Sequence, residues 1–465
     1  MIKTGIRIKA DSEKVIAKYL YIADENRVSR IISDVLLRDD LAVEKAVQGI
    51  MEEFENRHPG FKEVLLENYH RIESHISSPA TLSFSQKLLL GSYFTNEYSV
   101  ESAALFNPSI VIHPDQNGIK EGEVRFILSL RATGEGHISS IVFMSGIISR
   151  IGEISLDPRP SKLACPHISR NEKHSKDFVL KRAQYFEDSS ASDFAEFPEQ
   201  FSLAEAEQIS SGSKLKKVFQ DIFSMNYSFS FDEETVPGSR VIFPVSSAEL
   251  GGVEDVRFVE FTERSKTNYI GTYTAYDGIK IRPVIIETGD FISFRVRTLY
   301  GHAASNKGMA LFPEKINGQY AMIGRQDGEN ISLMYSNDLY RWDTYKVIQK
   351  PERDWELTQL GNCGSPLKTP SGWLLLTHAV GPMRKYVISA SLLDLHNPEH
   401  VLSSLDEPLI YPEDDEREGY VPNVVYTCGI IQHYNNLIIP YAMSDSSVSF
   451  ARVDISTLIN KLLNT

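Results

Sequence analysis

The sequence predicts a mainly β protein: a five-bladed β-propeller with an α-helical N-terminal region and a partly helical insertion. Two observations carry this prediction. Apolar residues recur at helical spacing up to about residue 100, and short strand-like runs replace them from about residue 104. Five strand pairs then follow at intervals of about 50 to 70 residues, as in propeller blades that bury their faces on one another. A β-sandwich is the alternative, and the regular spacing favours the propeller.

The first predicted domain, residues 1–100, is a helical extension. Residues 12–37 are expected to form one helix, and residues 41–54 and 61–72 each carry an apolar stripe at helical spacing. The sequence His58-Pro59-Gly60 separates the last two. Few side chains here suit a chemical role, so we expect a packing or oligomerisation module.

The second predicted domain, residues 101–465, holds five hairpins of one design. Each has an apolar strand, a polar residue near its end, a short turn and a second strand. The pairs are residues 124–131 with 137–143, 269–277 with 281–287, 319–325 with 331–335, 372–378 with 386–390, and 437–445 with 448–453. An insertion at about 157–235 is expected to be partly helical and peripheral to the blades. The apolar stretch 453–463 is expected to pack on the N-terminal helices.

Polar residues end the predicted inner strands. In a propeller, equivalent positions of the inner strands converge on the central axis, so these side chains should share one funnel. A fold needs no such polar pocket for stability, and we therefore predict a ligand site there. Its members, taken from the five hairpins, are Arg131, Tyr276 with Asp277, Arg325, His378 and Asp445.

The predicted pocket mixes cationic, acidic and aromatic side chains. Arginine suits bidentate contact with a phosphate or carboxylate, and lysine and histidine add charge. The cationic donors are Arg325, His378, Lys307 and Lys368; the carboxylates are Asp255, Asp277 and Asp445; and Tyr276, Tyr386 and Tyr420 can stack on a sugar face. An acid beside a phosphate site is the minimum for cleaving a glycosidic bond with phosphate as nucleophile. A water-using inverting enzyme would instead have a second carboxylate in place of the basic cluster.

Motifs between about residue 106 and residue 445 resemble glycoside hydrolase family 130, the β-mannoside phosphorylases and their hydrolytic relatives. The matching segments are Phe106–Ser109, Gly252–Arg257, Thr272–Gly278, Asn306–Gly318, Gly372–Leu374, Leu392–Leu395 and Val421–Tyr426. The resemblance implies a five-bladed propeller. It also implies inverting cleavage of a β-mannosidic bond by inorganic phosphate, which yields α-mannose 1-phosphate.

The resemblance also implies residue roles. Asp255 becomes the general acid, and its proton is thought to pass through a hydroxyl of the mannosyl unit. The phosphate-binding positions are Lys307, Arg325 and His378, with Lys368 as a weaker match; the sugar-contacting positions are Asn107, Arg131 and Asp445. Hydrolytic members carry carboxylates where this chain keeps basic residues, which favours phosphorolysis over hydrolysis. A propeller that binds a glycan or an anionic metabolite without catalysis remains open.

Three departures from the family pattern leave the linkage and the acceptor sugar open. Val256 follows Asp255 where the family usually has proline, and Gly324 precedes Arg325 where it has an aromatic residue or histidine. The first hairpin turns through a glycine-rich segment, 131–137, that is not typical of the best-known members.

Composition narrows the class of partner. The net charge of -14 argues against binding to nucleic acid or to an anionic membrane, since both need a basic surface. No apolar run approaches the roughly 20 residues that span a bilayer. The 3 cysteines are far apart, which suits a reducing cytoplasm. No metal-ligand spacing is present, so we expect no metal and no cofactor besides phosphate as co-substrate. The extra helices suggest a homo-oligomer.

Overall fold

The computed structural model describes residues 1–169, 172–187, 190–210, 215–264 and 266–464. Contacts divide the chain into two compact units: unit 1 comprises Met1–Ala10, Ala103–Arg159 and Pro166–Thr465, and unit 2 comprises Asp11–Ser102 and Pro160–Cys165. Among the described residues strand exceeds helix, so the fold is mainly β as predicted. None of the helices in the described ranges is long and apolar enough to cross a membrane.

Unit 2 is built from helices and a strand pair. Its elements are β3 (Val15–Tyr19), α1 (Glu25–Leu36), α2 (Asp40–Phe54), α3 (Phe61–Ile72), η1 (Glu73–His75), η2 (Pro79–Thr81), α4 (Phe84–Tyr93) and β4 (Thr95–Ser99). The prediction of one helix over 12–37 is wrong in its first half, because β3 pairs antiparallel with β4. Ile16 is buried between half-exposed neighbours, which is the burial pattern of a strand. Asp24 then begins α1 by accepting two backbone N–H groups.

Unit 1 contains all five predicted hairpins as antiparallel pairs: β6 with β7, β15 with β16, β19 with β20, β24 with β25, and β29 with β30. Eleven strands form one continuous sheet, which we divide at a single parallel pair into two parts, called the first and the second sheet. The first sheet holds β5 (Ala104–Ile112), β6 (Val124–Thr133), β7 (Ser139–Ile148), β8 (Ile154–Leu156) and β13 (Val241–Ile242). The second holds β14 (Gly252–Glu263), β15 (Lys266–Tyr276), β16 (Ile281–Thr288), β17 (Ser293–Thr298), β12 (Ser228–Ser230) and β9 (His167–Ser169). A parallel pairing of Gly252 with Ser139 links the two sheets.

Three further sheets follow in chain order. The third holds β18 (Ala310–Leu311), β19 (Tyr320–Gly324), β20 (Ile331–Ser336) and β21 (Lys346–Gln349). The fourth holds β22 (Gln359–Asn362), β23 (Leu367–Thr369), β24 (Gly372–Val380), β25 (Tyr386–Leu393) and β26 (Val401–Ser404). The fifth holds β27 (Val425–Tyr426), β28 (Ile431–His433), β29 (Asn436–Met443), β30 (Ser447–Asp454), β1 (Ile2–Lys3) and β2 (Ile8–Lys9). The first ten residues therefore belong to this sheet and not to the helical region.

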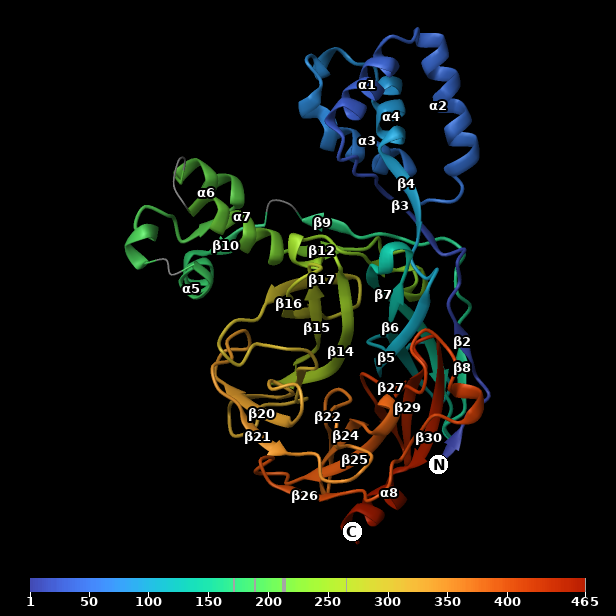
Figure 1. Cartoon of the computed structure of the whole chain (residues 1–465), viewed down its shortest axis with the longest axis vertical. Helices are drawn as coiled ribbons and strands as arrows, with labels where there is room; N and C mark the ends of the chain where they lie inside the picture. The colour runs from blue at the N-terminus through green and yellow to red at the C-terminus, as the bar shows by residue number, and fades with distance from the viewer. Residues whose placement is uncertain (170–171, 188–189, 211–214, 265, 465) are drawn as a thin grey trace. The chain divides into compact units, whose positions relative to one another are not determined.

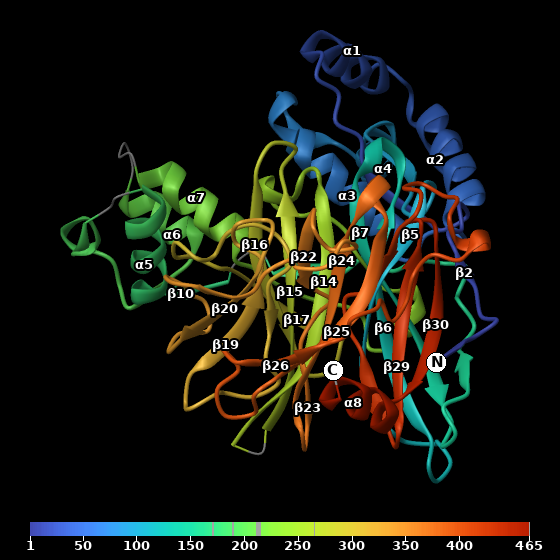
Figure 2. The ribbon, with the colours of Figure 1, turned by 60° about the horizontal axis from the view of Figure 1, so that its bottom comes forward.

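Each sheet contacts the next. β14 contacts β5, β6 and β7; β14 and β15 contact β18; β19 and β20 contact β22; β25 contacts β27; and β29 and β30 contact β5. Figure 1 shows these sheets following one another about a common centre, and in Figure 2 most of their strands run upright. In each sheet one further strand, β5, β14, β18, β22 or β27, precedes the hairpin in the chain and pairs with its first strand, and this feature positions the site described below.

Apolar side chains fill the spaces between neighbouring sheets. One core lies between the second and third sheets around Trp342, and another lies between the third and fourth around Phe312 and Trp373. A further core lies between the fourth and fifth sheets. The helix α8 (Ile455–Leu463) buries its apolar stripe in this last core against β25, β26 and β30. The prediction that residues 453–463 pack on the N-terminal helices is therefore wrong.

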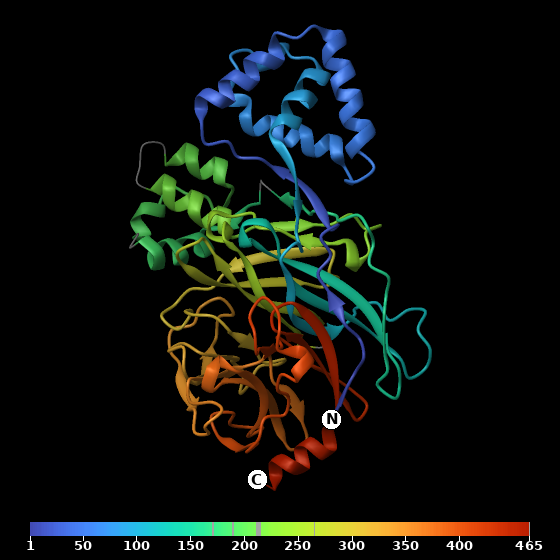
Figure 3. The ribbon, with the colours of Figure 1, turned by 45° about the vertical axis from the view of Figure 1, so that its right-hand side comes forward.

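The insertion is partly helical, as predicted. Its elements are β10 (His174–Ser175), α5 (Lys176–Glu187), η4 (Ala191–Phe194), β11 (Gln200–Phe201), α6 (Leu203–Ile209) and α7 (Leu215–Met225), and Figure 3 shows the helices in green beside the second sheet. It is less peripheral than predicted, because β9 and β12 extend the second sheet through β17. The carboxylate of buried Glu249 also connects the insertion to the second sheet, because it accepts hydrogen bonds from the hydroxyl of Tyr227, just before β12, and from the hydroxyl of Tyr273 in β15.

Candidate functional site

A cavity of about 250 Å³ collects side chains from all five sheets or from the loops beside them. It is lined by Phe106, Asn107, Arg131, Asp255, Lys307, Arg325, Gln359, His378, Arg384, Tyr386, Val421, Val424, Tyr426 and Asp445. Eight residues that were selected from the sequence lie here together: Asn107, Arg131, Asp255, Lys307, Arg325, His378, Tyr386 and Asp445. The polar strand ends therefore do converge, although they come from separate sheets.

Irregular backbone aims several of these side chains inward. The pairing of β5 with β6 shifts register next to Asn107, and that of β14 with β15 shifts next to Asp255. Both residues have positive φ, +49° and +56°, as β-bulge residues can. Asp445 has φ +50°. Such backbone costs roughly 1–3 kcal/mol per residue and persists where the surroundings hold it, which is common at functional sites.

Cations and an amide surround the Asp255 carboxylate. Its Oδ1 accepts from Asn107 Nδ2 at 2.6 Å and from Arg131 Nη1 at 3.3 Å. Burial alone raises the pKa of Asp255, but Arg131, Arg257 and the Asn107 hydrogen bond outweigh it and the net pKa lies below its usual value. Asp255 is therefore ionised at neutral pH. Its other carboxylate oxygen, Oδ2, has no hydrogen-bond partner among the described residues.

Asp445 behaves in the opposite way in the same cavity. Burial, and next the negative charge of Asp255, raise the pKa of Asp445 to about 7, although Arg131 and Arg384 oppose the shift. The cavity therefore holds two carboxylates whose environments separate their pKa values. A pair of this kind can divide acid and base roles.

Glu254 positions two of the cavity's cations. This carboxylate is 5% exposed and accepts from Arg131 Nη2 at 2.8 Å and from Lys307 Nζ at 2.5 Å. Because β14 bulges at the next residue, Glu254 and Asp255 can both face the same group of basic side chains. Glu254 thus holds Arg131 between two carboxylates.

His378 is a hydrogen-bond acceptor here and not the cationic donor that we predicted. Its Nε2 accepts from Arg325 Nη1 at 2.8 Å, and its Nδ1 lies 3.2 Å from the carbonyl oxygen of Asn362, to which it donates. Burial, then the charges of Arg325 and Arg257, hold the pKa of His378 well below its usual value. A neutral imidazole follows, so His378 orients Arg325 instead of adding charge.

Close packing fixes this histidine. Its ring stacks near Tyr386 and contacts Tyr426, with centroid distances of 6.1 and 4.8 Å. On the neighbouring strand β22, Gly361 leaves the space that the ring fills: a Cβ there would lie 2.4 Å from His378 Cε1. Strand pairing places Gly361 directly opposite His378.

Four residues predicted for the pocket do not line the cavity: Tyr276, Asp277, Lys368 and Tyr420. Asp277 accepts the backbone N–H groups of Ile279 and Lys280 and so stabilises the turn after β15, while the Tyr276 hydroxyl donates to the Gly278 carbonyl. Lys368 forms an ion pair with Glu314 in which both side chains are about half exposed. In the second sheet the strand that reaches the cavity is β14, which precedes the predicted hairpin.

Several residues that line the cavity were not predicted from the sequence. Gln359, Val424 and Tyr426 come from or beside β22 and β27, short strands that precede the fourth and fifth hairpins. Arg384 lies in the turn between β24 and β25. Tyr426 accepts from Arg257 Nη2 at 2.7 Å, which connects it to the strand carrying Asp255. For Val424 and Tyr426 the usable signal was the family-like segment Val421–Tyr426, which contains both.

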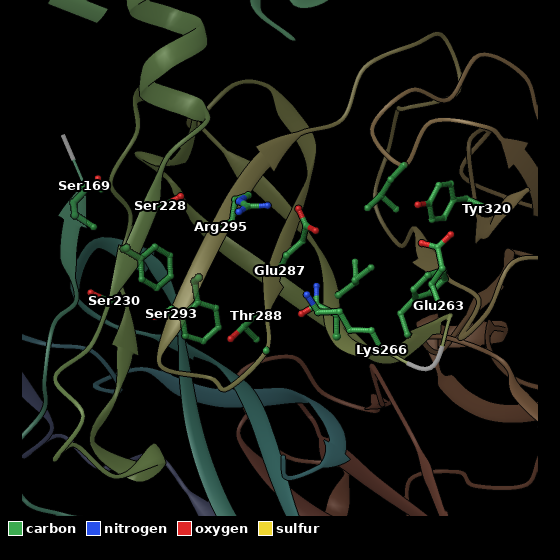
Figure 4. A pocket seen from close by; sticks show the side chains of 18 of the residues that line it. Ser169, Ser228, Ser230, Glu263, Lys266, Glu287, Thr288, Ser293, Arg295 and Tyr320 are labelled. Carbon is green, nitrogen blue, oxygen red and sulfur yellow. The ribbon is translucent and has the colours of Figure 1, made fainter. Parts of the chain in front are cut away.

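A larger groove lies elsewhere in unit 1. It measures about 1110 Å³ and runs over one face of the second sheet, where Figure 4 shows serines of β9 and β12 beside Arg295, Glu287 and Lys266. Its chemistry is that of a solvated sheet face, with the rows of side chains spread along the strands. The smaller cavity holds the clustered acids and bases, so we take that cavity as the candidate site.

Comparison with known proteins identifies the family of the chain. The sequence model of a family described as beta-1,4-mannooligosaccharide phosphorylase, Glyco_hydro_130, matches residues 222–464, which is more than half of the chain. The chain belongs to glycoside hydrolase family 130. Asp255, Lys307, Arg325, His378 and Asp445 lie within the matched range, whereas Asn107 and Arg131 precede it.

Individual relatives show how much of the chain resembles known proteins. A 1,2-beta-oligomannan phosphorylase of Thermoanaerobacter sp. (strain X514) is 38% identical over 33% of this chain and 52% of its own length. A beta-1,2-mannobiose phosphorylase of the same organism is 31% identical over 52% of this chain and 80% of its own. The chain thus spans about half the length of the first relative. A solved structure from Parabacteroides distasonis, described as a glycoside hydrolase, superposes with a TM-score of 0.50 at 16% identity over 78% of this chain and 90% of that chain, which shows a shared fold.

Proposed function

We propose that the chain is an inverting glycoside phosphorylase that cleaves a β-mannosidic bond with inorganic phosphate and releases α-mannose 1-phosphate. The observation that carries this proposal is the charge of the cavity. Arg131, Lys307, Arg325 and Arg384 line it, while Asp255 is its ionised carboxylate at neutral pH. A surplus of cations at the walls suits a phosphate dianion as nucleophile.

Asp255 is the proposed general acid, and its proton reaches the leaving oxygen through a hydroxyl of the mannosyl unit. A phosphate oxygen attacks the anomeric carbon, the bond from that carbon to the leaving oxygen breaks, and the β configuration becomes α. The free site keeps Asp255 ionised. A bound phosphate dianion partly neutralises the surrounding cations, so we expect the pKa of Asp255 to rise when phosphate binds.

The other roles follow from the same geometry. Arg325 and Lys307 bind phosphate, and His378 orients Arg325 as a neutral acceptor. Asn107, Arg131 and Asp445 contact the mannosyl unit. No role is proposed for Lys368, Tyr276 or Asp277, which lie outside the cavity. Because the relatives above are named for 1,2-linked mannosides, we propose a β-1,2 linkage as the first to test.

We further propose that the five sheets are the blades of a five-bladed β-propeller and that residues 101–465 form the catalytic domain, with 1–100 as an extension. The succession of contacts between neighbouring sheets supports this arrangement: β14 contacts β5 and β18, β19 contacts β22, β25 contacts β27, and β29 contacts β5. We also propose a cytoplasmic location, which the free thiols of Cys165, Cys363 and Cys428 suit. A homo-oligomer through the helical regions completes the proposal.

One observation favours hydrolysis as the second candidate. Asp445 is a second carboxylate in the cavity, and a pKa of about 7 suits a general base. The test is incubation with β-1,2- and β-1,4-mannobiose, with and without inorganic phosphate, followed by assay of mannose 1-phosphate and free mannose. Phosphate-dependent mannose 1-phosphate is expected. Free mannose at a rate independent of phosphate would support hydrolysis, and neither product would favour a glycan-binding role.

A further inference from the structure

Two hairpin loops of unit 1 share an unusual backbone. Between β6 and β7, Gly136 and His137 have φ of +66° and +60°; between β24 and β25, Met383 and Arg384 have φ of +58° and +55°. Each pair follows an extended glycine, Gly134 or Gly381. Left-handed residues that are not glycine, here His137, Met383 and Arg384, persist only where neighbours hold them. The first of these loops is the glycine-rich turn that departs from the family pattern.

Both loops lie next to the candidate site. The first continues from the cavity-lining Arg131 in β6, and the second continues from His378 in β24. Arg384 lies in the second loop, Tyr386 begins the strand after it, and both line the cavity. The loops therefore border its mouth.

A third segment, residues 417–424, joins the two loops. At one end the Tyr420 hydroxyl lies 2.9 Å from His137 Nδ1, and at the other the Asn423 carbonyl accepts the Tyr386 N–H at 3.0 Å. Between them the Val421 N–H donates to the Ser444 carbonyl at 3.0 Å, beside Asp445. Val421 and Val424 themselves line the cavity. The three segments thus form a continuous rim.

The rim presents binding groups outward. Tyr420 is 48% exposed. The Nδ1 of His137 is hydrogen-bonded to Tyr420, and the Nε2 of His137 has no hydrogen-bond partner among the described residues. Within the same ranges the Arg384 guanidinium makes neither a hydrogen bond nor an ion pair, and it lies 5.7 Å from the centre of the Tyr386 ring. An aromatic face with nearby donors is the usual equipment for holding a sugar ring.

We propose that His137, Tyr420 and Arg384 form the subsite for the sugar on the leaving-group side of the cleaved bond. This inference rests on the proposed function. The inner residues Asn107 and Asp255 take the mannosyl unit, so the adjoining sugar must lie toward the mouth, where the rim meets it. Tyr420 packs on its apolar face, and His137 and Arg384 bond its hydroxyls.

The test is the reverse reaction, in which mannose 1-phosphate and an acceptor sugar, either mannose or N-acetylglucosamine, give a disaccharide and phosphate. Tyr420→Ala should raise the acceptor KM about ten-fold, which corresponds to ~1.4 kcal/mol, and leave the KM of mannose 1-phosphate unchanged. His137→Ala should have a similar but smaller effect. The matched control is Tyr345→Ala, because Tyr345 is 45% exposed and lies outside the cavity.

Three outcomes would overturn the subsite: an unchanged acceptor KM in both rim variants, an equal rise in Tyr345→Ala, or an equal rise in the KM of mannose 1-phosphate. The last would mean that Tyr420 only supports the loops. If the wild-type protein turns over no mannoside in either direction, the proposed function fails. Calorimetric titration with β-1,2-mannobiose then tests the subsite alone: binding that Tyr420→Ala weakens supports it, and absent or unchanged binding refutes it.

Discussion

Replacing Gly361 by alanine tests the pair of His378 and Arg325 without altering either side chain. The added Cβ would lie 2.4 Å from His378 Cε1, 2.9 Å from Nε2 and 3.2 Å from Arg325 Nη1, whereas ordinary contact begins at 3.4 Å. The imidazole must therefore retreat by about 1 Å, and overpacking of this kind costs about 1–3 kcal/mol. It has little room, because Tyr426 packs on the ring and the Asn362 carbonyl holds Nδ1.

The acceptor of Arg325 moves with the ring, so we expect the KM for phosphate to rise about ten-fold or more, equivalent to ~1.4 kcal/mol of lost positioning. The KM for the mannoside should change less. Initial rates against phosphate concentration measure the effect, and thermal melting checks the fold. Gly289→Ala is the control, since the nearest atom to its added Cβ, Asn268 Oδ1, would be 3.8 Å away. A folded Gly361→Ala enzyme with the wild-type phosphate KM would refute the positioning role of His378.

Three other variants test the residue roles proposed for the cavity and the exclusion of Lys368 from it. Asp255→Asn should lower kcat by about 10²–10⁴-fold with little change in mannoside affinity by calorimetry, as removal of a general acid does; an unchanged kcat would exclude Asp255 as the acid. Asp445→Asn tests the raised pKa: the folded value of about 7 exceeds the unfolded 3.8, so the wild type loses stability relative to the variant as the pH rises toward 7, and the gap in Tm levels off above it. A gap that does not vary between pH 4 and 8 would contradict the shift. Lys368→Ala should leave the phosphate KM within about two-fold, because its ion pair with Glu314 is an exposed one; a large rise would return Lys368 to the phosphate site.

Short apolar runs bounded by turn residues located the five hairpins correctly, because most residues of these strands are buried on both faces and such runs are local patterns. The same patterns could not identify the strands that precede the hairpins. β18 and β27 have two residues each, which is too short for any period to show. Their positions depend on pairing with residues far along the chain. The residues on these strands, or just beside them, were found only where a family motif marked them, as with Lys307 and Asp255.

The prediction that Asp277 belongs to the site was wrong because its carboxylate forms local hydrogen bonds. A strand ending in Asp-Gly was interpreted as a polar end that faces a ligand, but the carboxylate serves its own turn by accepting two backbone N–H groups. The charge state of His378 was equally out of reach, since it depends on Arg325 and Asn362, which come from other strands. Sequence reasoning therefore identified which residues gather, and the structure determined what each one does.

The pairing of β1 and β2 with β30 has a consequence for the order of events during synthesis. Ile2 pairs with Arg452 and Ile8 with Val448, so β1 and β2 can complete their sheet only after about 440 further residues have been synthesised. At 5–20 residues per second the wait is about 20–90 s. Until then the N-terminal strands have no partner, while the intervening helices of unit 2 are free to fold. Closure of the fifth sheet is thus a late step of long range, and it covers the edge of β30 that would otherwise be open to pairing with another chain.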